Sequence, residues 1–116
     1  MKLEKFSFGL GDRFAHQGKA QLRAIMRANE SGLNISPVWN KSNREHTYVH
    51  SKPADVLVEA QEAVAALGYK GLYFVDADHI NLTTVAPFVD SANFFTLDVA
   101  AFIGKPSSES EVAAFV

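Results

Sequence analysis

The chain has 116 residues, of which 47% are hydrophobic and 21% are charged, a composition that suits a folded globular domain rather than a disordered one. Its formal net charge of -2, without any basic run, provides no general attraction to polyanions, so we expect no nucleic-acid partner. Cysteine is absent, which excludes disulfides and thiolate metal sites and suits a reducing cytoplasm.

Membrane insertion and export are not expected. No stretch approaches the run of about 20 apolar residues that crosses a bilayer. Residues 1–8 alternate charged and aromatic side chains and lack the apolar centre of a signal peptide. We therefore expect a cytoplasmic protein without a membrane partner.

The first two elements are a strand and a helix. Residues 6–10 are a short aromatic-rich run closed by Gly11, which predicts a buried strand leading into a tight loop. Apolar residues then recur at helical spacing with basic residues between them, and Gly32 follows as a stop. This pattern predicts a helix over residues 19–31.

A second strand and a second helix follow. Residues 35–39 predict a strand, although Pro37 removes one hydrogen bond from the ladder. Ser51 is the expected N-cap of the next helix, with a proline in its first turn. The apolar pattern continues to Leu67, and Gly68 ends the helix.

The second half of the chain repeats this order. Residues 71–75 predict a third strand that ends in acidic residues, and a capping signal at Asn81 indicates a helix over residues 85–90. Residues 93–99 supply a fourth strand that ends near Asp98. A last helix opens after Pro106 and is cut off by the chain end.

Strands and helices thus alternate along the chain, which predicts an α/β fold with parallel strands. Such units build either an open doubly wound sheet or half of a TIM-type (β/α)8 barrel, which needs roughly 200 residues or more. No G-x-G-x-x-G turn follows the first strand, and the sequence stops at a helix start. We therefore favour the first half of a barrel, with residues 1–116 as one partial domain at the N-terminal end of a longer protein.

In either architecture, function belongs where the strands end. Asp76, Asp78 and His79 follow the third predicted strand, and two carboxylates with an imidazole suit a divalent ion such as Mg²⁺, Mn²⁺ or Zn²⁺. In the alternative interpretation, Asp78 caps the following loop and His79 bonds to the backbone.

Two further strand ends are rich in polar residues. Residues 40–46 combine amide, ammonium, guanidinium, carboxylate and imidazole groups, the mixture that a sugar acid demands; a solvated loop is the alternative. Asp12 and Arg13 follow the first strand between flanking glycines, where they either bind substrate or form a local ion pair.

Three motifs together resemble the tagaturonate epimerase family, bacterial enzymes of hexuronate breakdown. They are G-x-G-D-R within residues 8–13, S-x-R-E within residues 39–46 and D-A-D-H within residues 74–80. The likeness runs from Phe6 to Lys105 and keeps the family's order and approximate spacing. Members of the family are much longer than this chain, so the resemblance implies that part of the active site lies on other residues.

The resemblance implies a divalent-metal-dependent interconversion of D-tagaturonate and D-fructuronate. These ketouronates differ at a hydroxyl-bearing carbon β to the ketone, where retro-aldol cleavage followed by re-addition on the other face can invert the centre. Carried onto this sequence, the catalytic candidates are Glu45, as the base, and Asp76. The metal candidates are Asp78 and His79, and the substrate-binding candidates are Asp12, Arg13, Asn40, Lys41 and Arg44.

The residues also leave other functions open. Another metal-dependent sugar-acid aldolase or isomerase would use the same strand-end groups, and a small α/β binding module would use none of them for catalysis. A stable fragment that pairs with itself through an unfinished barrel edge is a third alternative. The expected partner is a small sugar acid, and assembly into a homo-oligomer is left open.

Overall fold

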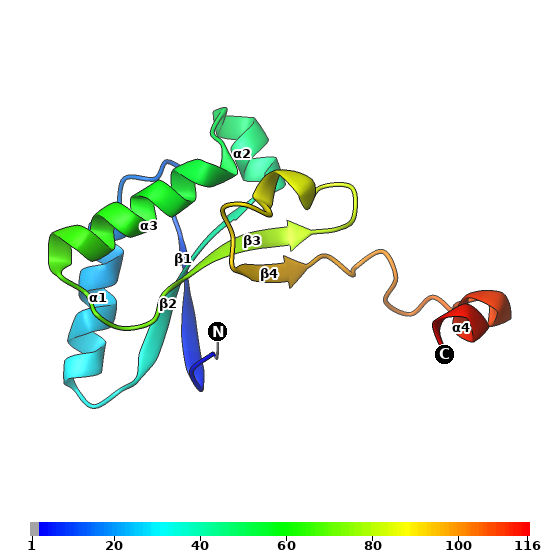
Figure 1. The fold of residues 1–116 in the computed structure, drawn as a ribbon, viewed down its shortest axis with the longest axis horizontal. Helices are drawn as coiled ribbons and strands as arrows, with labels where there is room; N and C mark the ends of the chain where they lie inside the picture. Colours follow the sequence, from blue (N-terminus) through cyan, green and yellow to red (C-terminus); the bar gives the residue numbers. More distant parts are fainter. Residues whose placement is uncertain (1–2) are drawn as a thin grey trace.

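The computed structural model describes residues 3–116 as a single sheet with helices (Figure 1). No helix within these residues is both long and apolar enough to cross a membrane. Along the chain, the elements are β1 (Phe6–Gly11), α1 (Gly18–Glu30), β2 (Ile35–Ser42), α2 (Asn43–Val49), α3 (Pro53–Leu67), β3 (Phe74–Ile80), the 3₁₀ turn η1 (Ala86–Phe88), β4 (Phe94–Leu97) and α4 (Glu109–Phe115).

The 4-stranded sheet has the order β1-β2-β3-β4, and every neighbouring pair is parallel. The predicted α/β fold with parallel, sequentially adjacent strands is therefore confirmed. Gly11 lies opposite Asn40, and Asn40 opposite Asp76, so the first three strands end at one edge. Asp98 follows β4 and donates its backbone N–H to the carbonyl of Ile80 at 2.9 Å, further along the same edge.

Helices α1 and α3 lie side by side against one face of the sheet (Figure 1). Their apolar stripes meet Trp39 of β2 and Val75 of β3 in the main core, and Leu22 of α1 is fully buried there. Gly68 ends α3 with φ of 62°, a left-handed conformation that glycine adopts without strain. The predicted end of this helix is confirmed.

Polar residues from two neighbouring strands lie on the opposite face of the sheet. Successive side chains of a strand point to opposite faces, so Asn40 and Asp76 lie on the face away from Trp39 and Val75. Asn40 covers the glycines of β1, since a Cβ added to Gly11 would lie 3.4 Å from its side-chain oxygen. In a closed barrel this face would be the interior, but closure of the sheet is a prediction that the four strands alone do not test.

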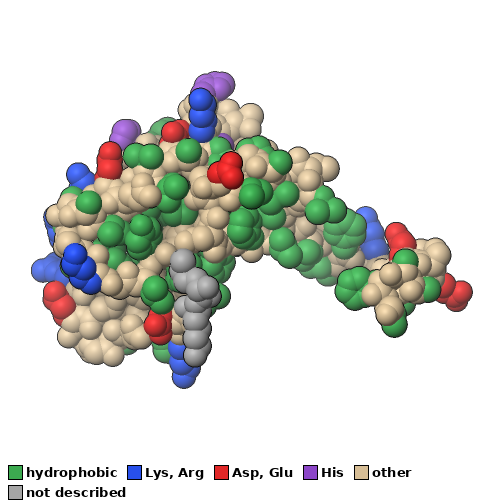
Figure 2. Space-filling view, in the orientation of Figure 1, with side chains coloured by type: hydrophobic (Ala, Val, Ile, Leu, Met, Phe, Trp, Pro, Cys, Tyr) green, Lys and Arg blue, Asp and Glu red, His purple; other side chains and the backbone are tan. Residues whose placement is uncertain are grey.

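The last strand has an apolar flank that nothing in residues 3–116 covers. Phe95 and Leu97 of β4 are exposed, and so are Phe102 and Ile103 beyond it. Helix α4 has no buried residue and stands away from the sheet at the end of an irregular segment (Figure 1). Figure 2 shows hydrophobic side chains gathered on the side of the molecule from which this segment leaves.

Two predicted segments are wrong in their boundaries or type. Residues 40–46 were expected to form a loop, but β2 runs on to Ser42 and α2 begins at Asn43. The third strand is Phe74–Ile80 rather than residues 71–75, so Asp76, Asp78 and His79 lie within the strand and not after it. In both segments, polar residues at the end of a strand stay in the ladder, since Asn40, Lys41 and Ser42 of β2 pair with residues 76–78 of β3.

Two smaller expectations are also corrected. The expected helix over residues 85–90 is only the 3₁₀ turn η1, which buries Phe88. The N-cap of α3 is Lys52, whose backbone N–H donates to Asp55 at 2.7 Å, and not Ser51. Ser51 instead bonds through its hydroxyl to Nδ1 of His46 at 2.8 Å. Its side chain therefore serves the short helix α2, which the sequence pattern did not predict.

Candidate active site at the carboxyl edge of the sheet

A polar pocket with a cavity volume of about 450 Å³ opens at the carboxyl edge of the sheet. Its lining comes from the loop after β1, the junction of β2 and α2, the end of β3 and the residue after β4. Two guanidinium groups, three carboxylates, one imidazole and one hydroxyl contribute: Arg13, Arg44, Glu45, Asp78, Asp98, His79 and Ser42. The chain therefore brings five of the predicted site residues into one pocket: Arg13, Arg44, Glu45, Asp78 and His79.

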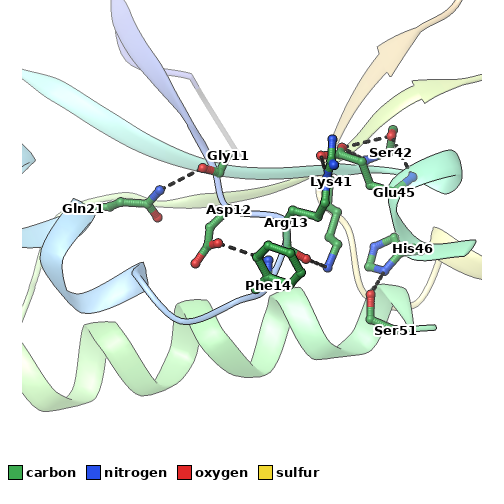
Figure 3. A network of polar contacts seen from close by, with 10 residues as sticks. All are labelled: Gly11, Asp12, Arg13, Phe14, Gln21, Lys41, Ser42, Glu45, His46 and Ser51. Atoms are coloured by element: carbon green, nitrogen blue, oxygen red, sulfur yellow. Dashed lines mark hydrogen bonds and ion pairs between the residues drawn. The ribbon is translucent and has the colours of Figure 1, made fainter. Parts of the chain in front are cut away.

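Glu45 is held by the start of its own helix. Its Oε2 accepts hydrogen bonds from the backbone N–H of Ser42 at 3.0 Å and from the Ser42 hydroxyl at 2.9 Å, which completes a capping box (Figure 3). Its Oε1 lies 4.0 Å from Nε of Arg13. Burial alone would raise the pKa of Glu45, but the hydrogen bonds from Ser42 and the charges of Arg13 and Lys41 lower it overall. Glu45 is thus an ionised acceptor at neutral pH.

Asp78 and His79 form a pair at the pocket wall. Nδ1 of His79 lies 2.7 Å from Oδ1 of Asp78, and the bulge that interrupts β3 near this point turns His79 into the left-handed region with φ of 54°. A left-handed conformation is uncommon for a residue other than glycine, and strain of this kind is frequent at functional sites. The pair leaves Nε2 of His79 available to a ligand.

The donor set fits part of a divalent-metal site. A carboxylate and an imidazole from adjacent residues share the pocket with the carboxylate of Asp98, and such oxygen and nitrogen donors suit Mn²⁺, Mg²⁺ or Zn²⁺. Within residues 3–116, however, no three His, Asp or Glu side chains converge closely enough to hold an ion. Among the described residues, Asp78 and His79 are thus suitable donors without a complete ligand shell around them.

Asp76 lies deeper than the pocket and does not line it. The residue is 6% exposed, and its carboxylate accepts hydrogen bonds from the backbone N–H of Thr96 at 3.0 Å and from its hydroxyl at 2.7 Å. Burial raises the pKa of Asp76, and the nearby charge of Asp78 adds to this, although the bonds from Thr96 oppose both. Asp76 thus ties β3 to β4, two residues before Asp78 in the same strand.

Asp12 anchors the backbone of the loop that carries Arg13. Its carboxylate accepts hydrogen bonds from the backbone N–H groups of Phe14 at 3.1 Å, His16 at 2.6 Å and Gln17 at 2.7 Å. Burial alone would raise the pKa of Asp12, but these three hydrogen bonds lower it overall. The side chain is used in shaping the loop and is not placed in the pocket.

Asn40 and Lys41 also lie outside the pocket lining, on opposite faces of β2. The side-chain oxygen of Asn40 is buried without a hydrogen-bond partner in residues 3–116, on the face that it shares with Asp76. Lys41 is 2% exposed, and its Nζ donates to the backbone carbonyl of Arg13 at 2.6 Å (Figure 3). Their predicted contacts with substrate stay predictions.

Two residues of the 40–46 segment that were not among the named site candidates also belong to this region. Ser42 lines the pocket and caps α2; its signal was the spacing Ser42-x-x-Glu45, which matches a capping box. His46 is buried between the Ser51 hydroxyl and the ring of Phe88. Burial and the charge of Lys41 lower the pKa of His46, so its imidazole is neutral near pH 7.

A larger apolar groove of about 730 Å³ lies along the uncovered flank of β4. It is lined mainly by hydrophobic residues such as Leu97 and Phe102 and contains no basic side chain. An anionic sugar would find no counter-charge there. The smaller polar pocket is therefore the candidate active site.

Fold and pocket together define a parallel β/α protein whose polar site lies at the carboxyl edge of its strands, the usual place for small-molecule chemistry in this class. The family model described as UxaE, tagaturonate epimerase, matches residues 1–115. The chain belongs to the tagaturonate epimerase family, and the resemblance seen in its sequence is confirmed.

A solved structure agrees with this assignment. The fructuronate-tagaturonate epimerase UxaE from Cohnella laeviribosi, crystallised with two glycerol molecules, is similar with a TM-score of 0.75 and 27% sequence identity. The match covers 95% of this chain and 23% of that epimerase, so the chain spans 23% of the relative's length. None of the curated proteins matches this chain.

Proposed function

We propose that this chain is the N-terminal part of a longer metal-dependent epimerase that interconverts D-tagaturonate and D-fructuronate, and that it supplies one wall of the active site. The family assignment supports the reaction class. The observation that carries the proposal is the polar pocket, because it combines two guanidinium groups with carboxylates and an imidazole at the end of parallel strands.

Arg13 and Arg44 are the proposed binding groups for the carboxylate of the ketouronate. Both line the pocket, and a guanidinium binds a carboxylate through two parallel N–H donors. Glu45 partly balances the charge of Arg13, since its Oε1 lies 4.0 Å from Nε of Arg13. Arg44 is the second guanidinium of the lining, and Asp78 and Asp98 add carboxylates that can accept hydrogen bonds from the hydroxyl groups of a sugar acid.

Asp78 and His79 are the proposed metal-binding residues. When bound, a divalent cation would polarise the ketone of the substrate. The remaining ligands would come from parts of the epimerase that the matched 23% does not cover. Asp78 would also hold the imidazole through its bond to Nδ1, the orientation that metal-binding histidines commonly need.

Glu45 is the proposed base. As an ionised carboxylate in the pocket, it would accept the proton of the hydroxyl group at the carbon to be inverted. The adjacent carbon–carbon bond can then break to an aldehyde and an enolate and re-form on the other face, after which Glu45 returns the proton to the new alkoxide. Asp76, bonded to Thr96, would hold β3 and β4 in place during this cycle.

The proposal is tested by assaying the full-length protein against a panel of ketouronates, with and without added divalent metal. We expect interconversion of tagaturonate and fructuronate that is lost after chelation and restored by metal. Turnover of a different sugar acid alone would favour another aldolase or isomerase. Absence of both turnover and metal binding would favour a non-catalytic binding module.

Two accompanying proposals concern the whole protein. We infer that the four parallel strands are part of a TIM-type barrel, which the sequential strand order and the polar residues on the face away from α1 and α3 support. We also infer a cytoplasmic location, for which the absence of cysteine is the support.

A further inference from the structure

Lys41 occupies an unusual position for a lysine near an anion-binding pocket. It lies between Asn40 and Ser42 in β2 but points to the other face of the strand, beside the loop that joins β1 to α1 (Figure 3). The side chain is 2% exposed, and its Nζ reaches the backbone carbonyl of Arg13 at 2.6 Å.

Within residues 3–116, no direct ion pair neutralises the ammonium group of Lys41. The ion pairs in residues 3–116 are Arg13 with Glu45 and Asp78 with His79. Burying an uncompensated charge costs free energy, so neighbouring groups must stabilise the ammonium group of Lys41 in this position. The carboxylates of Glu45 in α2 and Glu59 in α3 are near enough to feel its charge, as is the neutral imidazole of His46.

The loop that Lys41 contacts is fixed at both of its ends by other side chains. Nε2 of Gln21 donates to the carbonyl of Gly11 at 3.0 Å, and Oε1 of Glu59 accepts from the backbone N–H of Gly18 at 2.9 Å. Between these points, Asp12 accepts from the N–H groups that follow Arg13. The carbonyl of Arg13 itself is held by Lys41.

Arg13 needs such support because its guanidinium is exposed. Its side chain is 54% exposed, and its nearest carboxylate, Glu45, lies at the limit of an ion pair. Few contacts therefore restrict the long side chain of Arg13, and its position depends mainly on the backbone to which it is attached. Fixing the backbone in advance reduces the entropy that is lost when the guanidinium binds a carboxylate.

We propose that Lys41 is a positioning residue that holds the backbone of Arg13 in place for substrate binding, and that it makes no contact with the substrate itself. This inference rests on the proposed binding of a ketouronate by Arg13. It differs from the expectation that Lys41 binds the substrate carboxylate directly, and the two roles give different results in a double-mutant experiment.

The experiment uses the full-length protein with Lys41→Met, Arg13→Gln and the double variant, and Lys70→Met as a matched control. Lys70 is an exposed lysine between α3 and β3, away from the pocket. Steady-state kinetics on tagaturonate give KM and kcat, and hydrogen exchange gives the protection of the Phe14, His16 and Gln17 amides. For Lys41→Met we expect KM to rise roughly tenfold with kcat within about threefold, and exchange at these amides to accelerate.

The double variant distinguishes the two roles of Lys41. If Lys41 acts through Arg13, Lys41→Met changes KM little once Arg13 is glutamine. Equal effects of Lys41→Met in both backgrounds, with amide exchange unchanged, would show direct binding and overturn the proposal. Lys70→Met should resemble the wild type in both measurements.

A second variant covers the case in which Lys41→Met fails to fold. Lys41→Arg keeps a cationic donor of similar reach, and we expect KM to rise only if loop exchange also accelerates. A raised KM with unchanged exchange would overturn the proposal. If no variant and not even the wild type turns over ketouronates, the proposed function fails, while the exchange of the loop amides still tests the role of Lys41.

Discussion

Residue by residue, the acidic groups around the pocket fall into two electrostatic classes. Hydrogen bonds and neighbouring cations lower the pKa of Glu45 despite its partial burial, whereas burial raises the pKa of Asp76 despite its bonds to Thr96. A lowered pKa keeps Glu45 ionised at neutral pH. Asp76, which is outside the pocket lining, is the more readily protonated of the two groups.

Glu45→Gln separates catalysis from helix capping. Glutamine retains an oxygen that can accept from Ser42 but loses the basic carboxylate, so kcat of the full-length protein should fall by about 10²-fold or more. The control is Glu111→Gln, because Glu111 forms the same capping box with Ser108 at the start of α4, outside the polar pocket. Near-normal kcat in Glu45→Gln would leave Glu45 with a capping role only.

The same carboxylate predicts a pH dependence of stability. The folded-state pKa of Glu45 lies below its unfolded value, so its contribution is present above the unfolded pKa and is lost as the pH falls through the folded one. We expect the free energy of unfolding of Glu45→Gln to approach that of the wild type below about pH 4.3. Denaturant titrations across that pH range measure the difference in free energy of unfolding between the two proteins. A difference that does not change with pH would contradict a lowered pKa of Glu45.

Two substitutions at His79 are expected to affect metal binding alike but to differ in stability. His79→Ala should weaken metal binding, and excess metal should partly restore activity if the other ligands remain. His79→Gly removes the same imidazole but also relieves the left-handed backbone, so we expect it to be more stable than His79→Ala. Calorimetric metal titration and thermal unfolding measure the two effects. Unchanged metal content in both variants would remove His79 from the site.

At the scale of elements, long apolar patterns were predictable and short polar ones were not. Helices α1 and α3 follow the expected periodicity because their apolar stripes form the main core. Helix α2 has no such stripe: it buries only His46 and depends on the capping box between Ser42 and Glu45. The local signal was present in the sequence, but a helix held mainly by its cap and tertiary contacts resembles a polar loop.

The end of β3 was difficult to predict for a related reason. A strand between a helical layer and a polar face alternates Val75 and Ala77 with Asp76 and Asp78, so its acidic residues look like the start of a loop. The strand-end location of the site was nevertheless predictable, because it follows from parallel topology alone. Which side chains enter the pocket depends on strand faces and on a bulge, which the sequence does not specify.

Leu22 tests how the helical layer supports the site. It is 0% exposed within the core that joins α1 to the sheet, so Leu22→Ala should lower the free energy of unfolding by about 2–5 kcal/mol. Leu33→Ala is the control, since Leu33 is 54% exposed. Denaturant unfolding of both variants measures the difference. Similar losses in the two would mean that α1 does not pack as described.

For the molecule as a whole, the sheet has two outer strands and an uncovered apolar flank. In the described part of the chain, β1 and β4 each pair with one neighbouring strand, and Phe95 and Leu97 of β4 are exposed. The similar epimerase from Cohnella laeviribosi is much longer, with 23% of it matched by this chain. In a barrel, further strands would pair with these edges, and further strand ends would complete the pocket.

These edges lead to a prediction about activity. We expect the 116-residue chain on its own to show no turnover of tagaturonate or fructuronate, even with added Mn²⁺, Mg²⁺ or Zn²⁺, while the full-length protein is active under the same conditions. The reason is that the pocket has two adjacent candidate ligands but no converging set of three in residues 3–116. Assays of both proteins, with circular dichroism to establish that the shorter one is folded, provide the measurement. Metal-dependent turnover by the folded 116-residue chain would show that the pocket described here is already a complete active site.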